Sequence, residues 1–152
     1  MTSTIKIISH SEKETQVLGE KIAPLIGKGK IAFLKGSLGS GKTTFVKGVT
    51  KYYQCLQQAK SPTFILISTY SGRIDVNHCD FYRIKNSEDI FDLAIEELLE
   101  KGNLIIEWPE IVTKYIYPPD LELSFSILND SEREIILTFK NNEILNKFSG
   151  NE

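Results

Sequence analysis

The chain has 152 residues, enough for one domain with a sizeable core, and its 41% hydrophobic and 25% charged residues are ordinary for a globular protein. A formal net charge of −2 argues against direct binding to nucleic acid or to an anionic membrane surface. No apolar run approaches the length of about 18 residues that a membrane-spanning helix needs, and the N-terminus has no signal-peptide core. We therefore expect a cytoplasmic protein with reduced cysteines.

The N-terminal segment is predicted to form a short strand and then a helix. Residues 5–8 are β-prone, and Ser11 and Glu14 after them fit the capping-box pattern S-x-x-E. Apolar residues then recur at helical spacing, at Leu18, Ile22, Leu25 and Ile26. We expect an amphipathic helix that ends at Gly27.

A glycine-rich loop follows, between a predicted strand over residues 31–34 and a predicted helix that extends to about Tyr53. Residues 36–43, GSLGSGKT, fit the phosphate-binding pattern G-x-x-x-x-G-K-[ST]. The glycines let the backbone aim its N–H groups at phosphate oxygens, and the start of the helix adds its positive dipole end. Lys42 would bind the β- and γ-phosphates, and the Thr43 hydroxyl would ligate Mg²⁺. The residues expected to hold the nucleotide here are Gly36, Ser37, Leu38, Gly39, Ser40, Gly41, Lys42, Thr43 and Thr44.

Two antiparallel strands are predicted next. Residues 61–63, SPT, open an extended run over residues 64–70, because Pro62 disfavours a helix. Residues 71–72 suit a two-residue hairpin turn, and a second strand covers residues 74–80.

The second half of the chain continues with alternating helices and strands. A helix capped by Ser87 is predicted to end at residues 101–102, and the apolar run after it forms a strand that ends in Glu107. Residues 109–117 are compatible with one helical turn or two. The remaining predicted elements are a hairpin of strands 121–128 and 134–139 around a turn at 129–131, and a polar tail from residue 141 that forms a short helix or frays.

Five further residues are candidates for nucleotide chemistry. Glu107 ends an apolar strand, as Walker B acids do, although most such strands end in Asp; it would hold the metal or orient water. Asp80 would serve the metal shell or position water, and His78 on the same strand face is either a hydrogen-bonded structural residue or a catalyst. Thr63 is either a switch residue at the γ-phosphate or part of a turn. Trp108 would stack in the site or plug the sheet edge.

Scarce residue types narrow the class of nucleotide-binding protein. The chain has only three arginines, whereas kinases of phosphorylated substrates need several cations as clamps. It also lacks the Asn-Lys-x-Asp element that guanine-binding proteins carry. ATP is therefore a better candidate than GTP.

Four motifs, in order and in spacing, resemble the bacterial TsaE family, formerly YjeE: GSLGSGKTT at 36–44, SPTF at 61–64, HCDFYR at 78–83 and IEWPE at 106–110. The resemblance implies an α/β, P-loop NTPase-like fold with a mixed parallel and antiparallel sheet flanked by helices. It also implies an ATPase required for threonylcarbamoyladenosine at position 37 of tRNAs. Such a protein works with TsaB and TsaD and reaches tRNA through these partners.

The resemblance also implies residue roles. By position, the catalytic residues would be Lys42, Asp80, Glu107 and Thr63, the metal ligands Thr43 and Glu107, and Trp108 an aromatic at the edge of the nucleotide site. The chain departs from the family at Ser37, where Asp is usual, and at Ser40, often Ala. Ser37 removes a negative charge near the phosphates.

The sequence therefore predicts a single P-loop domain over residues 1–152 that binds ATP and Mg²⁺. Its hydrolysis is expected to be weak alone and stimulated by protein partners. Two alternatives remain open, a small-molecule kinase with the same loop and a nucleotide-regulated binding module without catalysis. The respective roles of Asp80 and Glu107, and the source of any catalytic arginine, also remain open.

Overall fold

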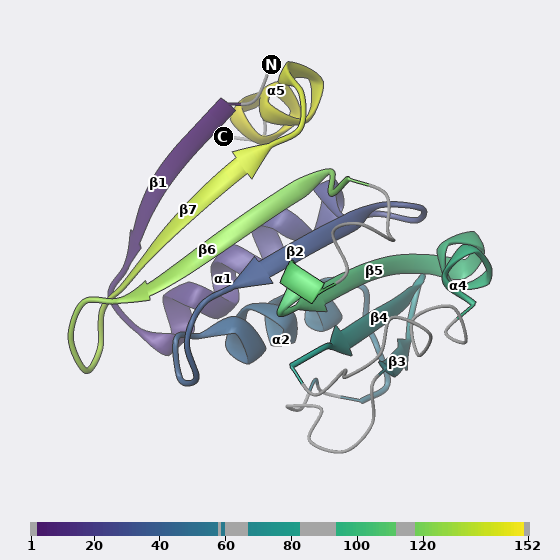
Figure 1. Ribbon diagram of the computed structural model, residues 1–152, viewed down its shortest axis with the longest axis horizontal. Coiled ribbons are helices and arrows are strands. Elements are labelled where there is room, and N and C mark those ends of the chain that lie inside the picture. The colour runs from purple at the N-terminus through teal and green to yellow at the C-terminus, as the bar shows by residue number, and fades with distance from the viewer. Residues whose placement is uncertain (1–2, 58, 60–66, 83–93, 112–117, 151–152) are drawn as a thin grey trace.

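The computed structural model describes residues 3–57, 59, 67–82, 94–111 and 118–150. Their centre is a seven-stranded sheet in the order β1-β7-β6-β2-β5-β4-β3 (Figure 1). The strands are β1 (Ser3–Ser9), β2 (Ile31–Lys35), β3 (Ile67–Ser71), β4 (Asp75–Asp80), β5 (Gly102–Glu107), β6 (Leu121–Ile127) and β7 (Arg133–Phe139). The helices are α1 (Glu12–Ile22), α2 (Lys42–Tyr52), α4 (Ile95–Lys101) and α5 (Asn142–Gly150), with 3-10 turns at Ala23–Leu25 and Pro109–Ile111.

The sheet is mixed, which confirms the predicted fold class. Strand β2 runs parallel to β5 on one side and to β6 on the other, and β4 runs parallel to β5. The pairs β3–β4, β6–β7 and β1–β7 are antiparallel. Because β2, β4 and β5 share one direction, their carboxyl ends meet at one edge of the sheet, which is where ligands of such sheets bind.

Helices α1 and α2 lie next to each other behind the sheet in Figure 1 and touch backbone to backbone at two glycines. A Cβ on Gly19 would lie 2.1 Å from the carbonyl oxygen of Phe45, and a Cβ on Gly48 would lie 2.0 Å from that of Gln16. Nothing larger than hydrogen fits at either position without moving a helix. The two glycines therefore set how closely α2, which begins at the phosphate-binding loop, lies against α1.

Helix α1 ends earlier than the apolar spacing predicts. Ile22 is its last residue, and the 3-10 turn follows at once, so the prediction of a helix up to Gly27 was wrong. Pro24 accounts for the difference, because it has no N–H to donate to the carbonyl four residues earlier.

Apolar side chains pack on both faces of the sheet. Along β2, Ala32 and Leu34 join the larger core with α1, α2 and α5, while Ile31 and Phe33 join a smaller core with α4. Burial on both faces explains why this central parallel strand is continuously apolar instead of alternating.

The β3–β4 pair is antiparallel as predicted, but its connection is longer than the predicted two residues. Ser71 pairs with Asp75, so residues 72–74 form the connection. The backbone N–H of Arg73 donates to the carbonyl of Tyr53 over 2.7 Å, and this bond holds the connection against the end of α2.

The remaining expectations are met in part. Between residues 109 and 117 the structure describes one 3-10 turn, and the polar tail forms α5. The predicted cap Ser87 and the candidate Thr63 lie outside the described residues. Within the described ranges, no helix is long and apolar enough to span a membrane.

Candidate functional site

The loop between β2 and α2 takes its shape from three glycines. Gly36, Gly39 and Gly41 have φ angles of +149°, +77° and +107°, which other residues rarely adopt. A Cβ at Gly36 would also lie 2.8 Å from the carbonyl oxygen of Phe125 in β6. Helix α2 begins at Lys42, and its first N–H groups have no acceptor within the helix. The cap residue Gly41 has no side chain to accept from them either. Such a loop and helix start are suited to bind phosphate.

Lys42, the first residue of α2, carries a buried charge at this loop. Its Nζ donates to the carbonyl of Gly36 over 2.6 Å and lies 3.6 Å from Oε1 of Glu107. The same nitrogen lies 4.5 Å from the centre of the Trp108 ring. Only 5% of Lys42 is exposed, so the ammonium is held between a carbonyl, a carboxylate and an aromatic face.

Glu107 ends β5 as the sequence predicts, and it is as buried as Lys42. Its two oxygens have different partners, because Oε2 lies 2.7 Å from Nε2 of His78 while Oε1 faces Lys42. Burial raises the pKa of Glu107, but His78 and Lys42 outweigh burial, so the pKa lies below its usual value. Glu107 is therefore a charged acid at neutral pH.

Asp80 lies beside Glu107 because β4 and β5 run parallel with these two residues in register. Burial raises the pKa of Asp80; the Tyr82 N–H, which donates to Oδ1 over 3.0 Å, lowers it, and nearby Glu107 raises it further. The net pKa lies above the usual value. The pKa values of the two acids are thus shifted in opposite directions, that of Asp80 upward and that of Glu107 downward.

Trp108 follows Glu107 with a φ of +58°, a left-handed conformation that is rare for a tryptophan. Its ring packs against Tyr82, with ring centres 4.9 Å apart, as well as over Lys42. The ring therefore lies in the lining of the site, beside Lys42.

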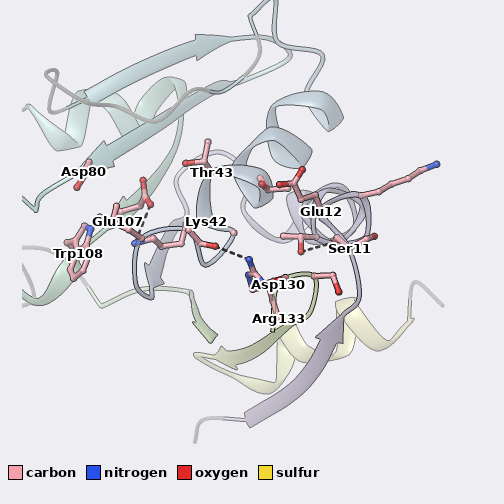
Figure 2. Close-up of a pocket in the computed structure, with 16 residues that line it drawn as sticks. Ser11, Glu12, Lys42, Thr43, Asp80, Glu107, Trp108, Asp130 and Arg133 are labelled. Carbon is pink, nitrogen blue, oxygen red and sulfur yellow. Dashed lines mark hydrogen bonds and ion pairs between the residues drawn. The ribbon is translucent and has the colours of Figure 1, made fainter. Parts of the chain in front are cut away.

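These groups line a cleft of about 750 Å³, shown in Figure 2. Asp80, Glu107 and Trp108 gather at one end, Ser11, Glu12, Asp130 and Arg133 lie toward the other, and Lys42 lies between them. The complete lining is Ser11, Glu12, Lys13, Thr15, Leu38, Gly39, Gly41, Lys42, Thr43, Thr44, Asp80, Glu107, Trp108, Asp130, Ser131 and Arg133.

Most of the predicted site residues meet in this cleft. Three loop residues do not line it: the Gly36 carbonyl binds Lys42, Ser37 lies beside it in the loop, and Ser40 is fully buried with an unpaired hydroxyl. Thr63 lies outside the described residues.

The far end of the cleft was missed by sequence reasoning. Arg133, at the start of β7, donates from Nη2 to the carbonyl of Gly39 over 3.2 Å and so ties the β6–β7 hairpin to the loop. Asp130 and Ser131 come from the turn of the same hairpin, and the start of α1 completes this end. Nothing near these residues in sequence marks them, apart from the capping box at Ser11.

The donor set fits a magnesium ion that arrives with a nucleotide. Among the described residues there is no cluster of three or more His, Cys, Asp or Glu side chains that could hold an ion alone. Mg²⁺ in such sites takes only one or two protein oxygens, and phosphates and water complete its shell. Thr43 and Glu107, both at the cleft, supply a hydroxyl and a charged carboxylate of the required kind.

The chain is similar in sequence and in fold to proteins of one known family. The family model described as "Threonylcarbamoyl adenosine biosynthesis protein TsaE" matches residues 9–135. Proteins named "tRNA threonylcarbamoyladenosine biosynthesis protein TsaE" are similar: that of Rickettsia conorii is 36% identical over 88% of this chain and 78% of its own. That of Treponema pallidum is 34% identical over 86% and 98%. The crystal structure of YdiB from Bacillus subtilis has a TM-score of 0.79 at 24% identity, over 99% of this chain and 97% of YdiB, and shows the same fold.

Proposed function

This chain belongs to the TsaE family of threonylcarbamoyladenosine biosynthesis, and from that membership and the geometry of its cleft we propose that it binds Mg·ATP and hydrolyses it in support of tRNA modification. The observation that carries the proposal is the convergence of Lys42, Asp80 and Glu107 beside a glycine loop at the carboxyl edge of the sheet. Fold alone would not identify the reaction, because many functions share this sheet.

The loop amides and Lys42 would hold the β- and γ-phosphates. Thr43 and Glu107 would hold Mg²⁺, which offsets negative charge on the phosphates when it is bound. Asp80, whose pKa is raised, suits the task of accepting a hydrogen bond from the attacking water. Trp108 would cover Lys42 and limit access of bulk water to the phosphates.

The proposed partners are TsaB and TsaD, with tRNA held by them and not by this chain. The net charge of −2 supports this division, because a protein that binds RNA directly needs a basic surface. Family membership supports the pathway, and the place of action we propose is the cytoplasm. Hydrolysis by this chain would then support the work of the TsaB–TsaD complex, and the chain would not phosphorylate a free metabolite.

The test is release of ADP from Mg·ATP by the protein alone and with TsaB, TsaD and tRNA. We expect a low rate alone that rises at least about tenfold with the pair, an increase of about 1.4 kcal/mol in transition-state stabilisation. Thr43→Val should remove most of this rate, because it keeps the shape but loses the hydroxyl at the cleft. Thr50→Val is the matched control: Thr50 is also in α2, but its hydroxyl donates to the Lys47 carbonyl away from the cleft.

A rate that does not respond to the pair would contradict the partners and leave the ATPase standing. Equal rates in Thr43→Val and Thr50→Val would contradict the role of Thr43. If ADP forms together with a phosphorylated metabolite, and none forms when water is the sole acceptor, the result would favour a kinase.

A further inference from the structure

Among the residues that the structure describes, the His78 side chain makes one hydrogen bond, with Glu107. Its Nε2 is 2.7 Å from Oε2 of Glu107, none of its surface is exposed, and its Nδ1 is buried without a hydrogen bond. A carboxylate and an imidazole at this distance share a strong hydrogen bond.

A histidine is an unfavourable choice at position 78 if the side chain serves only to pack the core. On the same face of β4, Val76 belongs to the large core, and the neighbour in β5 is Ile105, which is also buried in that core. An apolar side chain would fit such surroundings without leaving a buried nitrogen unpaired. Within the described part of the chain, the side-chain hydrogen bond of His78 is made with the acid of the cleft, Glu107.

We propose that His78 is a positioning residue for Glu107, an inference that rests on the proposed function. By holding Oε2, His78 leaves Oε1 as the one carboxylate oxygen that faces Lys42 and the cleft. The torsion that turns a Glu carboxylate is soft and nearly two-fold, so the bond from His78 to Oε2 and the ion pair of Lys42 with Oε1 together fix the plane of the group. Without His78 the ion pair with Lys42 alone restrains the carboxylate, and once Lys42 turns to the phosphates no bond holds its oxygen toward the metal or water.

Three variants separate positioning from packing. His78→Leu removes the hydrogen bond, and His78→Gln keeps an N–H donor near the place of Nε2. Asn77→Ala is the control for stability: Asn77 is the buried neighbour in β4, but it donates to Asn103 and not toward the cleft. All three variants are expected to lower the melting temperature, His78→Leu because it leaves Oε2 of the buried Glu107 without its hydrogen bond.

The expected result is a loss of rate without a loss of substrate affinity. In His78→Leu, kcat for ADP release should fall about 10- to 100-fold, with KM for ATP within about threefold of wild type. His78→Gln should recover kcat to within about threefold, and Asn77→Ala should keep it. Calorimetry gives a second readout: Mg²⁺ tightens ADP binding in wild type and in His78→Gln, and tightens it about tenfold less in His78→Leu.

A double-mutant cycle completes the test. If His78 acts through Glu107, then His78→Leu costs no further rate and no further Mg²⁺-dependent affinity when Glu107→Gln is already present. The proposal is overturned if His78→Leu matches Asn77→Ala in both readouts, if His78→Gln fails as badly as His78→Leu, or if the losses persist in Glu107→Gln. A wild-type protein that binds ADP but releases none from ATP would refute the proposed hydrolysis, and the calorimetry would still decide the role of His78. A wild-type protein that binds no nucleotide overturns both.

Discussion

Replacing Lys42 with methionine should affect stability and turnover together, and the structure gives the size of the first effect. Met keeps much of the aliphatic stem but loses the hydrogen bond to Gly36 and the ion pair with Glu107. Breaking a buried pair from one side costs about 3–5 kcal/mol. Since His78 still pairs with Glu107, we expect the lower figure, about 3 kcal/mol. For a chain of 152 residues this lowers the melting temperature by about 6–12 °C.

Calorimetric melting without nucleotide measures this cost, and ADP release with TsaB and TsaD measures turnover. Loss of one preorganised charge at the phosphates should reduce turnover at least about 10²- to 10³-fold. The stability cost should largely disappear in the Glu107→Gln background, where no charge is left uncompensated. A Lys42→Met protein that melts within about 2 °C of wild type would show that the buried pair contributes little. Wild-type turnover in that variant would refute the nucleotide site itself.

Two predictions concern the scaffold behind the cleft. Gly48→Ala places a Cβ 2.0 Å from the Gln16 carbonyl oxygen, so overpacking should cost about 2 kcal/mol of stability, or about 4–8 °C in melting temperature. The control is Gly27→Ala, whose Cβ meets nothing closer than 3.8 Å and which should melt near wild type. Equal melting temperatures of the two variants would contradict the close packing of α1 and α2. Tyr53 donates to the Ala23 carbonyl over 2.7 Å, and burial and the neighbouring Tyr52 raise its pKa to about 12. The neutral phenol therefore stabilises the folded protein fully below the unfolded pKa of about 10, and this contribution is lost as the pH rises to about 12. In urea unfolding, the difference in stability between wild type and Tyr53→Phe should narrow over that pH range. A difference that stays constant up to pH 11 would show that Tyr53 ionises in the folded protein as it does when unfolded.

Local chemistry explains what the sequence predicts well. The glycines of the loop are visible because the backbone angles at Gly36, Gly39 and Gly41 exclude other residues, and the requirement acts within a few positions. Glu107 is predictable for a similar reason, since a continuous apolar strand must be central and its last residue must emerge at the carboxyl edge. Both signals are short and depend on no distant contact.

The parts that sequence reasoning misses depend on contacts between distant segments. Arg133 reaches the loop only because β7 pairs with β6 and β6 lies beside β2, so its contact with Gly39 spans 94 positions. The partnership of His78 and Glu107 spans 29 positions and follows from a parallel register that no local pattern specifies. For His78 the sequence left structural and catalytic roles open, and the structure adds the missing fact, which is its partner.

The balance of charge in the cleft connects these residues to the choice of substrate. The described lining has three cationic side chains, Lys13, Lys42 and Arg133, against four anionic ones, Glu12, Asp80, Glu107 and Asp130. A triphosphate without a cation would meet a surface that is not positive overall, and in binding it Lys42 would leave Oε1 of Glu107 without its positive partner. With a divalent cation bound alongside, as the proposed function requires, Glu107 would have another positive partner and Lys42 would be available to the phosphates. Because His78 is bound to the other carboxylate oxygen, Lys42 and the divalent cation would both interact with the same atom of Glu107, Oε1. On the proposed function, Mg·ATP and not free ATP is therefore the form that this arrangement of charges suits.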